Sequence, residues 1–256
     1  EVLDYVRFVS DSACRFAGMQ SDILKKYVKP GDFITTNGLF GNLDNHRMTE
    51  ESLDFITYDS YPNFAYCLDD YEPGEGKMRD RKWSRNLAEA RAISPVFGIM
   101  EQQSGANGWN TRMEAPTPKP GQMTLWTMQS IGHGADYVSY FRWRTCTVGT
   151  EIYWHGILDY SGRDNRRLAE VKEIHKKVGA LAPVTGAHYR AEVGTMITSG
   201  MPVWTDGTRG WTGKAAKDCS PPARKPIHPL ISAIWIICGR RICSRIKSCS
   251  ILMPPL

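Results

Sequence analysis

The sequence predicts an α/β fold in which parallel strands alternate with helices, and two observations support this prediction. First, four short segments rich in β-branched and aromatic residues recur along the chain, with helical segments between them. Second, each strand segment ends in polar or aromatic residues, which is typical of the active-site face of a βα barrel. We therefore expect functional side chains to gather at the carboxyl ends of the strands.

The predicted elements follow one another in a regular order. A helix at residues 11–27 precedes the first strand, which follows the turn signal Lys29-Pro30-Gly31. The four predicted strands share β-branched and aromatic composition and lie at residues 32–37, 53–62, 93–101 and 135–143. Three further helices are expected at residues 80–92, 121–133 and 165–178. This alternation predicts parallel βα units.

Glu101 is the first candidate for a catalytic residue. It follows the apolar run Phe97-Gly98-Ile99-Met100 and precedes Gln102-Gln103-Ser104-Gly105. A carboxylate at the point where a buried strand opens into a loop is held by the fold and still faces solvent, which suits a nucleophile. Taken alone, the same pattern also fits an acid that only caps a neighbouring helix.

Several motifs together resemble glycoside hydrolase family 42 β-galactosidases, over residues 4–193. The motifs match the family in order and spacing, and they are Thr35-Thr36-Asn37, Asp59-Ser60-Tyr61-Pro62, Met100-Glu101-Gln102-Gln103, Asn107-Gly108-Trp109, His133-Gly134-Ala135-Asp136 and Tyr140-Phe141-Arg142-Trp143-Arg144. The resemblance implies an α/β fold that is a partial (β/α)8 TIM barrel, about strands 5 to 8 with their helices. The remainder, residues 194–256, is expected to be an irregular tail.

The resemblance also implies the activity, which is hydrolysis of terminal non-reducing β-D-galactose residues in β-galactosides. It assigns the nucleophile to Glu101. It assigns substrate binding to Trp109 as a wall of the sugar pocket, to Phe141 and Trp143 at the tip of the last strand, and to Glu151 and His155 as partners of galactose hydroxyls. The last two match with a small offset in spacing. The alternatives are core packing for the tryptophans and a solvated loop for Glu151 and His155.

The chemistry of a retaining glycosidase gives these residue types a reason. It needs two carboxyl groups about 5 Å apart, one to attack the anomeric carbon and one to protonate the leaving oxygen. The attacking group must stay ionised, so we expect a cation such as Arg142 or Arg144 nearby. No cofactor and no metal are implied.

The second carboxyl group is the main departure from the family. In the family it belongs to an Asn-Glu pair at the end of the fourth barrel strand, and this chain contains no Asn-Glu pair. We therefore expect residues 1–193 to be the carboxyl half of the barrel and to be inactive alone. The alternative function is a non-catalytic or differently specific barrel, such as a β-glucan hydrolase or a sugar-binding fragment.

The tail differs in composition from the rest of the chain. From residue 195 onward it holds nine Lys or Arg and two Asp, a net charge of +7, whereas the whole chain carries +5. It also contains Cys219, Cys238, Cys243 and Cys249. Three interpretations remain open: a basic tail that binds nucleic acid or membrane, a zinc site, although the cysteine spacing does not fit paired ligands, or translation of a shifted reading frame. We favour the third, because codons for residues 241–254 can be chosen so that the shifted frame resembles the family's next domain.

Partners and location are also predicted. The expected partner is a β-galactoside oligosaccharide, and neither nucleic acid nor a membrane is expected. The longest apolar run of the tail, residues 230–238, is far shorter than the about 20 residues that a membrane span needs. We expect a cytoplasmic protein whose full-length form is a homo-oligomer. Half a barrel leaves open strand edges, near Phe33 and Val138, which favour aggregation of the chain alone.

Overall fold

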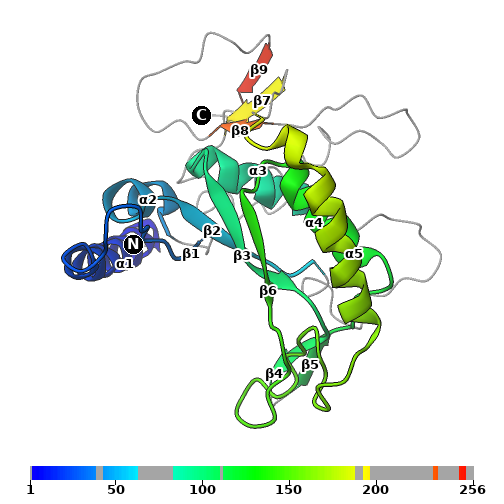
Figure 1. The fold of residues 1–256 in the computed structure, drawn as a ribbon. Coiled ribbons are helices and arrows are strands. Elements are labelled where there is room, and N and C mark those ends of the chain that lie inside the picture. Colours follow the sequence, from blue (N-terminus) through cyan, green and yellow to red (C-terminus); the bar gives the residue numbers. More distant parts are fainter. Residues whose placement is uncertain are drawn as a thin grey trace. The chain divides into compact units, whose positions relative to one another are not determined.

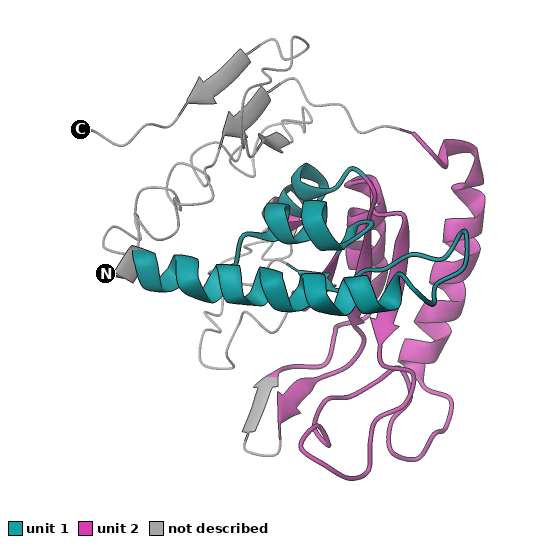
Figure 2. Ribbon diagram, turned by 90° about the vertical axis from the view of Figure 1, so that its left-hand side faces the viewer, with its two compact units in different colours: residues 1–56, 88–95, 190–256 teal, residues 57–87, 96–189 magenta. Residues whose placement is uncertain are grey.

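The computed structural model describes residues 2–38, 43–62, 83–109 and 112–187, and three short strands in the last part of the chain. The chain forms two compact units (Figure 2). Unit 1 comprises residues 1–56, 88–95 and 190–256, and unit 2 comprises residues 57–87 and 96–189. All of the predicted site residues belong to unit 2.

Unit 1 contains two helices, α1 (Val2–Leu24) and α2 (Asn45–Ser52). The side chain of Asp44 caps α2 by accepting from the Arg47 backbone N–H at 3.0 Å, and the Asp44 N–H donates to Ser10 Oγ of α1 at 2.8 Å. The buried side chains of Cys14 and Met48 lie on these two helices. Helix α1 begins earlier than the predicted start at residue 11, and α2 was not predicted.

The prediction of a strand at residues 32–37 is wrong, because only β1 (Asn37–Gly38) is a strand there. The preceding residues bond to the segment ahead of the next strand partly through side chains. Asp54 Oδ2 accepts from the Ile34 N–H at 2.6 Å, and Thr35 Oγ1 donates to the Phe55 carbonyl at 2.7 Å. The Asp54 N–H also donates to the Ile34 carbonyl at 2.9 Å, so backbone and side-chain bonds are mixed here and no regular ladder forms. The predicted open edge near Phe33 is therefore not a strand edge.

Unit 2 contains a sheet in which β3 (Phe97–Gln103) lies between β2 (Ile56–Ser60) and β6 (Tyr137–Phe141). All of β2 except its first residue belongs to this unit. Strands β3 and β6 are parallel. The βα alternation and the α/β class predicted from the sequence are thereby confirmed.

Helices α4 (Gln122–Gly132) and α5 (Arg166–Ala180) run beside each other next to β6 (Figure 1). They agree with the predictions at residues 121–133 and 165–178 to within two residues. Their common core consists of Met123, Trp126 and Ile174, and Tyr140 of β6 packs against it. Burying large apolar side chains of this kind stabilises the fold by about 1.5–3 kcal/mol each. The core therefore fixes α5 against β6.

Several smaller elements complete the chain. Helix α3 (Trp83–Ile93) begins in unit 2 and ends in unit 1, and residues 80–82 of its predicted range lie outside the described part. Strands β4 (Asn107–Trp109) and β5 (Arg112–Ala115) form an antiparallel pair beyond the carboxyl ends of β3 and β6 (Figure 1). A short 3-10 helix, η3 (Ala182–Val184), follows α5.

In the predicted tail, the described residues form three strands. Strand β7 (Val193–Met196) pairs in parallel with β8 (Ala233–Trp235) and with β9 (Ser248–Ile251). The domain boundary at residue 193 and the shifted reading frame stay predictions, and Cys219, Cys238 and Cys243 lie outside the described residues. Across the part of the chain that the structure describes, no helix is both long enough and apolar enough to cross a membrane.

Candidate active site

Glu101 lies at an irregularity within β3 and not at the end of the strand, which continues to Gln103. The register pairs Ile99 with Val138 and then Gln102 with Tyr140, so two residues of β3 face one residue of β6. This is the geometry of a β-bulge, which changes the direction of side chains locally and recurs next to active sites. Met100 and Glu101 form the bulged part of β3. Both residues are half-buried, whereas Ile99 before them and Gln102 after them are buried.

Tyr61 directly contacts the predicted nucleophile. Its phenolic O–H donates to Glu101 Oε2 at 2.5 Å, across 40 positions of sequence. Burial raises the pKa of the Tyr61 phenol, and the hydrogen bond to Glu101 raises it further. The phenol therefore keeps its proton and remains a donor. A donor of this kind stabilises the ionised form of a carboxylate.

Buried polar side chains tie the strand tips around Glu101 to one another. The Gln102 side chain, which is fully buried, donates from Nε2 to the Ser60 carbonyl of β2 at 3.1 Å. Ser104 Oγ donates to the Phe141 carbonyl at the end of β6 at 2.7 Å. The end of β3 is thus bonded to the end of β2 on one side and to the end of β6 on the other. The Glu-Gln-Gln motif supplies one residue for the site and another that holds it in place.

Four aromatic rings meet beside Glu101, and Trp154 is in contact with the other three. Its ring centroid lies 5.1 Å from that of Tyr61, 5.1 Å from that of Trp109 and 6.5 Å from that of Phe141. Trp154 is only 7% exposed, whereas Trp109 is 36% exposed and leaves part of its ring open to solvent. Edge and tilted contacts of this kind are favourable aromatic geometries.

Arg142 contacts two of the predicted substrate-binding residues. Its guanidinium lies over the Phe141 ring, 4.1 Å from the centroid, and forms an ion pair with Glu151. Arg142 also donates to Cys146 Sγ. The expectation that Arg142 or Arg144 lies near Glu101 stays a prediction, and Tyr61 is a donor that the structure does bring to Glu101.

His155 follows Trp154 directly and lies in a loop between β6 and α5. Its backbone N–H donates to the Ala106 carbonyl, just beyond β3, at 2.8 Å. Its imidazole Nδ1 lies 3.6 Å from Asp159 Oδ1, and its ring packs edge-on against Tyr160 at 5.2 Å. The loop thereby brings His155 to the end of β3 that carries Glu101.

The structure places most of the predicted residues in one region of unit 2. Trp109 and Phe141 join through Trp154 to the Tyr61–Glu101 pair, and Glu151 joins Phe141 through Arg142. Trp143 differs from these, because it is 60% exposed and is not one of the four rings around Trp154. The roles assigned to all six residues remain predictions.

Sequence reasoning missed Tyr61 and Trp154 as site residues. Tyr61 stood within the Asp59-Ser60-Tyr61-Pro62 motif, so its position after a strand was a usable signal. Trp154 carried no comparable signal, because its neighbours in space are distant in sequence. In the described residues, no group of three or more His, Cys, Asp or Glu side chains is placed to hold a metal ion.

Comparison with known proteins connects this geometry to a family. The family model described as beta-galactosidase, of glycoside hydrolase family 42, matches residues 1–181. The chain is 40% identical over 182 residues to the beta-galactosidase BgaA of Clostridium cellulovorans, covering 70% of this chain and 26% of that protein. It is 34% identical over 189 residues to a beta-galactosidase of Thermus thermophilus, covering 71% of this chain and 29% of that protein.

Solved structures agree with the sequence comparison. The beta-galactosidase of Halorubrum lacusprofundi superposes with a TM-score of 0.66 at 30% identity, covering 77% of this chain and 30% of its own. That of Marinomonas ef1 gives 0.69 at 27% identity, covering 82% and 34%. The chain spans less than a third of the length of the curated relatives from Clostridium cellulovorans and Thermus thermophilus. Because the family model matches more than half of its residues, the chain belongs to the β-galactosidases of glycoside hydrolase family 42.

Proposed function

We propose that the protein containing this chain hydrolyses terminal β-D-galactosides by a retaining, two-step mechanism in which Glu101 is the nucleophile. The observation that carries the proposal is the hydrogen bond of 2.5 Å from Tyr61 to Glu101 Oε2, at the bulge of β3 and beside an aromatic cluster. Family membership supports it, since the matched relatives are named beta-galactosidases.

The arrangement fits the first step of such a reaction. Glu101 attacks the anomeric carbon, the bond to the leaving oxygen breaks, and a glycosyl ester on Glu101 forms. The Tyr61 O–H donates a hydrogen bond to Glu101 Oε2 and thereby orients the carboxylate that attacks. Water then cleaves the ester and regenerates the free carboxylate.

Substrate recognition is assigned to the surrounding side chains. The partly open Trp109 ring and the Phe141 ring offer apolar surfaces to the C–H faces of a sugar. Glu151 and His155 are polar groups suited to its hydroxyls, and the Arg142 pair orients the carboxylate of Glu151. This combination of aromatic walls with a few directed polar groups is typical of a small-molecule site.

Labelling with a 2-deoxy-2-fluoro-β-galactoside that carries an activated leaving group tests the nucleophile. In the full-length protein, the fluorosugar is expected to become bonded to the peptide that contains Glu101, as measured by mass spectrometry. Glu101→Ala is expected to lower turnover of aryl galactosides by orders of magnitude, since it removes the attacking group.

The matched control is Glu173→Gln, which removes an exposed carboxylate of α5 that pairs only locally with Lys176. It is expected to retain both labelling and turnover. Label on a different carboxylate, or turnover retained after Glu101→Ala, would refute the assignment. Faster hydrolysis of aryl glucosides than of aryl galactosides would refute the choice of sugar.

The chain alone is proposed to be inactive. A retaining glycosidase needs a second carboxyl group that protonates the leaving oxygen, and the family's Asn-Glu pair does not occur in this sequence. An assay of the isolated 256-residue chain on aryl galactosides is expected to show no turnover above that of its Glu101→Ala variant. A measurable difference between the two would contradict the proposal.

A further inference from the structure

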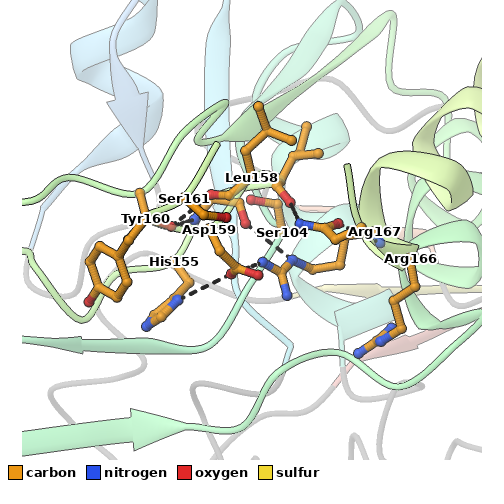
Figure 3. A network of polar contacts seen from close by, with 12 residues as sticks. Ser104, His155, Leu158, Asp159, Tyr160, Ser161, Arg166 and Arg167 are labelled. Carbon is orange, nitrogen blue, oxygen red and sulfur yellow. Dashed lines mark hydrogen bonds and ion pairs between the residues drawn. The ribbon is translucent and has the colours of Figure 1, made fainter. Parts of the chain in front are cut away.

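Arg167 is a buried cation that the proposed reaction does not use. It is the second residue of α5 and is only 7% exposed. Its guanidinium donates from Nε to the Gly156 carbonyl at 3.2 Å and from Nη2 to Asp159 Oδ1. Arg167 therefore contacts both ends of the turn that directly follows His155. Figure 3 shows Arg167, Asp159 and His155 close to one another.

The same turn is held on its other sides by backbone and amide groups. The His155 N–H bonds to the Ala106 carbonyl at 2.8 Å, and the Ile157 N–H bonds to the Arg142 carbonyl at 2.7 Å. Asn165, the N-cap of α5, donates from Nδ2 to the Ile157 carbonyl at 2.9 Å. The segment thus lies between the end of β3, the end of β6 and the first turn of α5.

The space around this segment is closely filled. A Cβ atom added at Gly105 would lie 2.4 Å from the His155 carbonyl oxygen, and one added at Gly156 would lie 2.4 Å from the Arg142 carbonyl oxygen. Both close approaches involve backbone atoms, so the backbone around His155 is closely packed at these two glycines. The remaining freedom is the orientation of the His155 side chain.

Asp159 faces that side chain. Its Oδ1, which accepts from Arg167, is 3.6 Å from His155 Nδ1 (Figure 3). This distance is too long for a hydrogen bond and is that of an electrostatic contact. A carboxylate on this side of the ring favours the orientation that turns Nδ1 toward it and Nε2 away from it. Arg167 in turn fixes the carboxylate.

A role in stability alone does not explain an ion pair between a buried arginine and a half-exposed aspartate at this place. Removing a guanidinium from water is costly, and apolar residues of similar volume often stabilise a core at least as well. An Arg–Asp pair instead supplies directed bonds from a planar group, which define the geometry of what it holds. Here that is the segment carrying a residue to which the proposed function assigns sugar binding.

We infer that Arg167 and Asp159 are positioning residues that hold the His155 imidazole in the orientation required to bind the galactosyl group. The inference rests on the proposed function of the site. Arg167 acts through the Gly156 carbonyl and Asp159, and Asp159 acts on the ring. Neither residue is assigned a contact with the sugar.

A double-mutant cycle in the full-length protein tests whether Arg167 acts through His155. Arg167→Met and His155→Ala are each expected to lower kcat/KM for an aryl galactoside by about 10- to 100-fold, because small misplacements of binding groups cost this much. The double variant is expected to be no worse than His155→Ala, since the effect of Arg167 is lost once His155 is gone. Losses that multiply would overturn the inference.

Further variants keep the test decisive if Arg167→Met folds poorly. Arg167→Lys retains the charge beside Asp159 and loses the planar pair of donors, so an intermediate loss of kcat/KM is expected. Asp159→Asn keeps the acceptor for Arg167 and removes the negative charge that faces His155. It is expected to lower kcat/KM, and some loss of stability accompanies it because the buried Arg167 loses its paired charge. Unchanged kcat/KM in both of these variants would overturn the inference.

Hydrogen exchange at the backbone amides of residues 152–160 provides a readout independent of activity. It is expected to become faster in Arg167→Met and to stay unchanged in the control Lys176→Met, which removes an exposed cation of the same helix. Absence of label on Glu101 in the unsubstituted protein would contradict the proposed function. Labelled protein whose kcat/KM does not respond to Arg167→Met would contradict only the positioning role.

Discussion

At the scale of single residues, the environment of Glu101 is decided by a hydrogen bond and by aromatic contacts. Tyr61 donates to the carboxylate at 2.5 Å, and the Trp154 ring packs against Tyr61, Trp109 and Phe141. The polar contact orients the attacking group, and the ring contacts fix the position of the Tyr61 donor. An electrostatic interaction of this kind is stronger in a partly buried site than in water.

Tyr61→Phe is expected to lower the turnover number of the full-length protein about 10- to 100-fold. The substitution removes one hydrogen bond to a charged group, worth about 1.5–3 kcal/mol, and preserves the ring that packs on Trp154. Steady-state kinetics on aryl galactosides would measure it.

The control for this prediction is Tyr160→Phe, which removes a more exposed hydroxyl that donates to the Ile152 carbonyl. It is expected to change turnover much less than Tyr61→Phe. Equal effects of the two substitutions would show that the Tyr61 hydroxyl has no special relation to the nucleophile.

At the scale of elements, the sheet of unit 2 depends on a close approach of β3 and β6. Gly98 of β3 is paired with Tyr137 of β6, and the two strands change register immediately afterwards, at the bulge that contains Glu101. A side chain at position 98 would occupy the space of the Tyr137 ring, since an added Cβ would lie 2.1 Å from a ring atom. The glycine is therefore required by space, and it precedes the segment that aims the nucleophile.

Gly98→Ala is expected to destabilise the chain by about 1–3 kcal/mol, the usual cost of overpacking. The free energy of unfolding in urea, followed by circular dichroism, would measure this loss. Gly98→Ala combined with Tyr137→Ala is expected to recover part of it, because the clashing ring is removed. If the double variant lost more free energy of unfolding than the two single variants lost together, the steric explanation would be wrong.

At the scale of the whole molecule, stability depends on pH through Tyr61. Burial and the bond to Glu101 raise the pKa of this phenol above its ordinary value of 10.0. The folded state thus keeps a proton that the unfolded state releases above about pH 10. The unfolded state then binds fewer protons than the folded state, so the free energy of unfolding falls as pH rises.

The stability that Tyr61 contributes is expected to be present below about pH 10 and to decrease above it. Urea unfolding of the chain and of Tyr61→Phe between pH 8 and pH 11 would measure the contribution as the difference between the two. We expect this difference to shrink toward the alkaline end. A difference that is constant or grows with pH would contradict the raised pKa.

Strand edges are the second property of the molecule as a whole. Strand β6 is the last strand in the order of its sheet, as the sequence predicted for the edge at Val138. Exposed edges favour association, and a charged side chain on an edge strand opposes it. We expect the isolated chain to self-associate, and Ser139→Lys, at an exposed position of β6, to reduce this.

Sedimentation velocity over a range of concentrations would compare the isolated chain with its Ser139→Lys variant. Lys176→Ser, which changes charge on the exposed face of α5, serves as the control. A monodisperse chain, or a variant that associates equally strongly, would show that the β6 edge is not the cause.

The fold could be predicted from the sequence where the signal is local. Helices α4 and α5 were predicted to within two residues, because apolar periodicity and the capping residue Asn165 are read directly from the chain. Helix α2 and the antiparallel pair β4–β5 were missed, since each is short and carries little local signal. The strand at residues 32–37 was wrong, because β-branched composition does not reveal that side-chain bonds interrupt the backbone pairing there.

The sequence by itself determined the family, the βα alternation and the presence of Glu101 on a strand beside polar residues. Tertiary structure decided that Glu101 lies at a bulge, that Tyr61 donates a hydrogen bond to it and that Trp154 contacts the other aromatic rings. The physical reason is that strand register and contacts between residues 40 positions apart depend on packing across the sheet, and local propensities do not encode them.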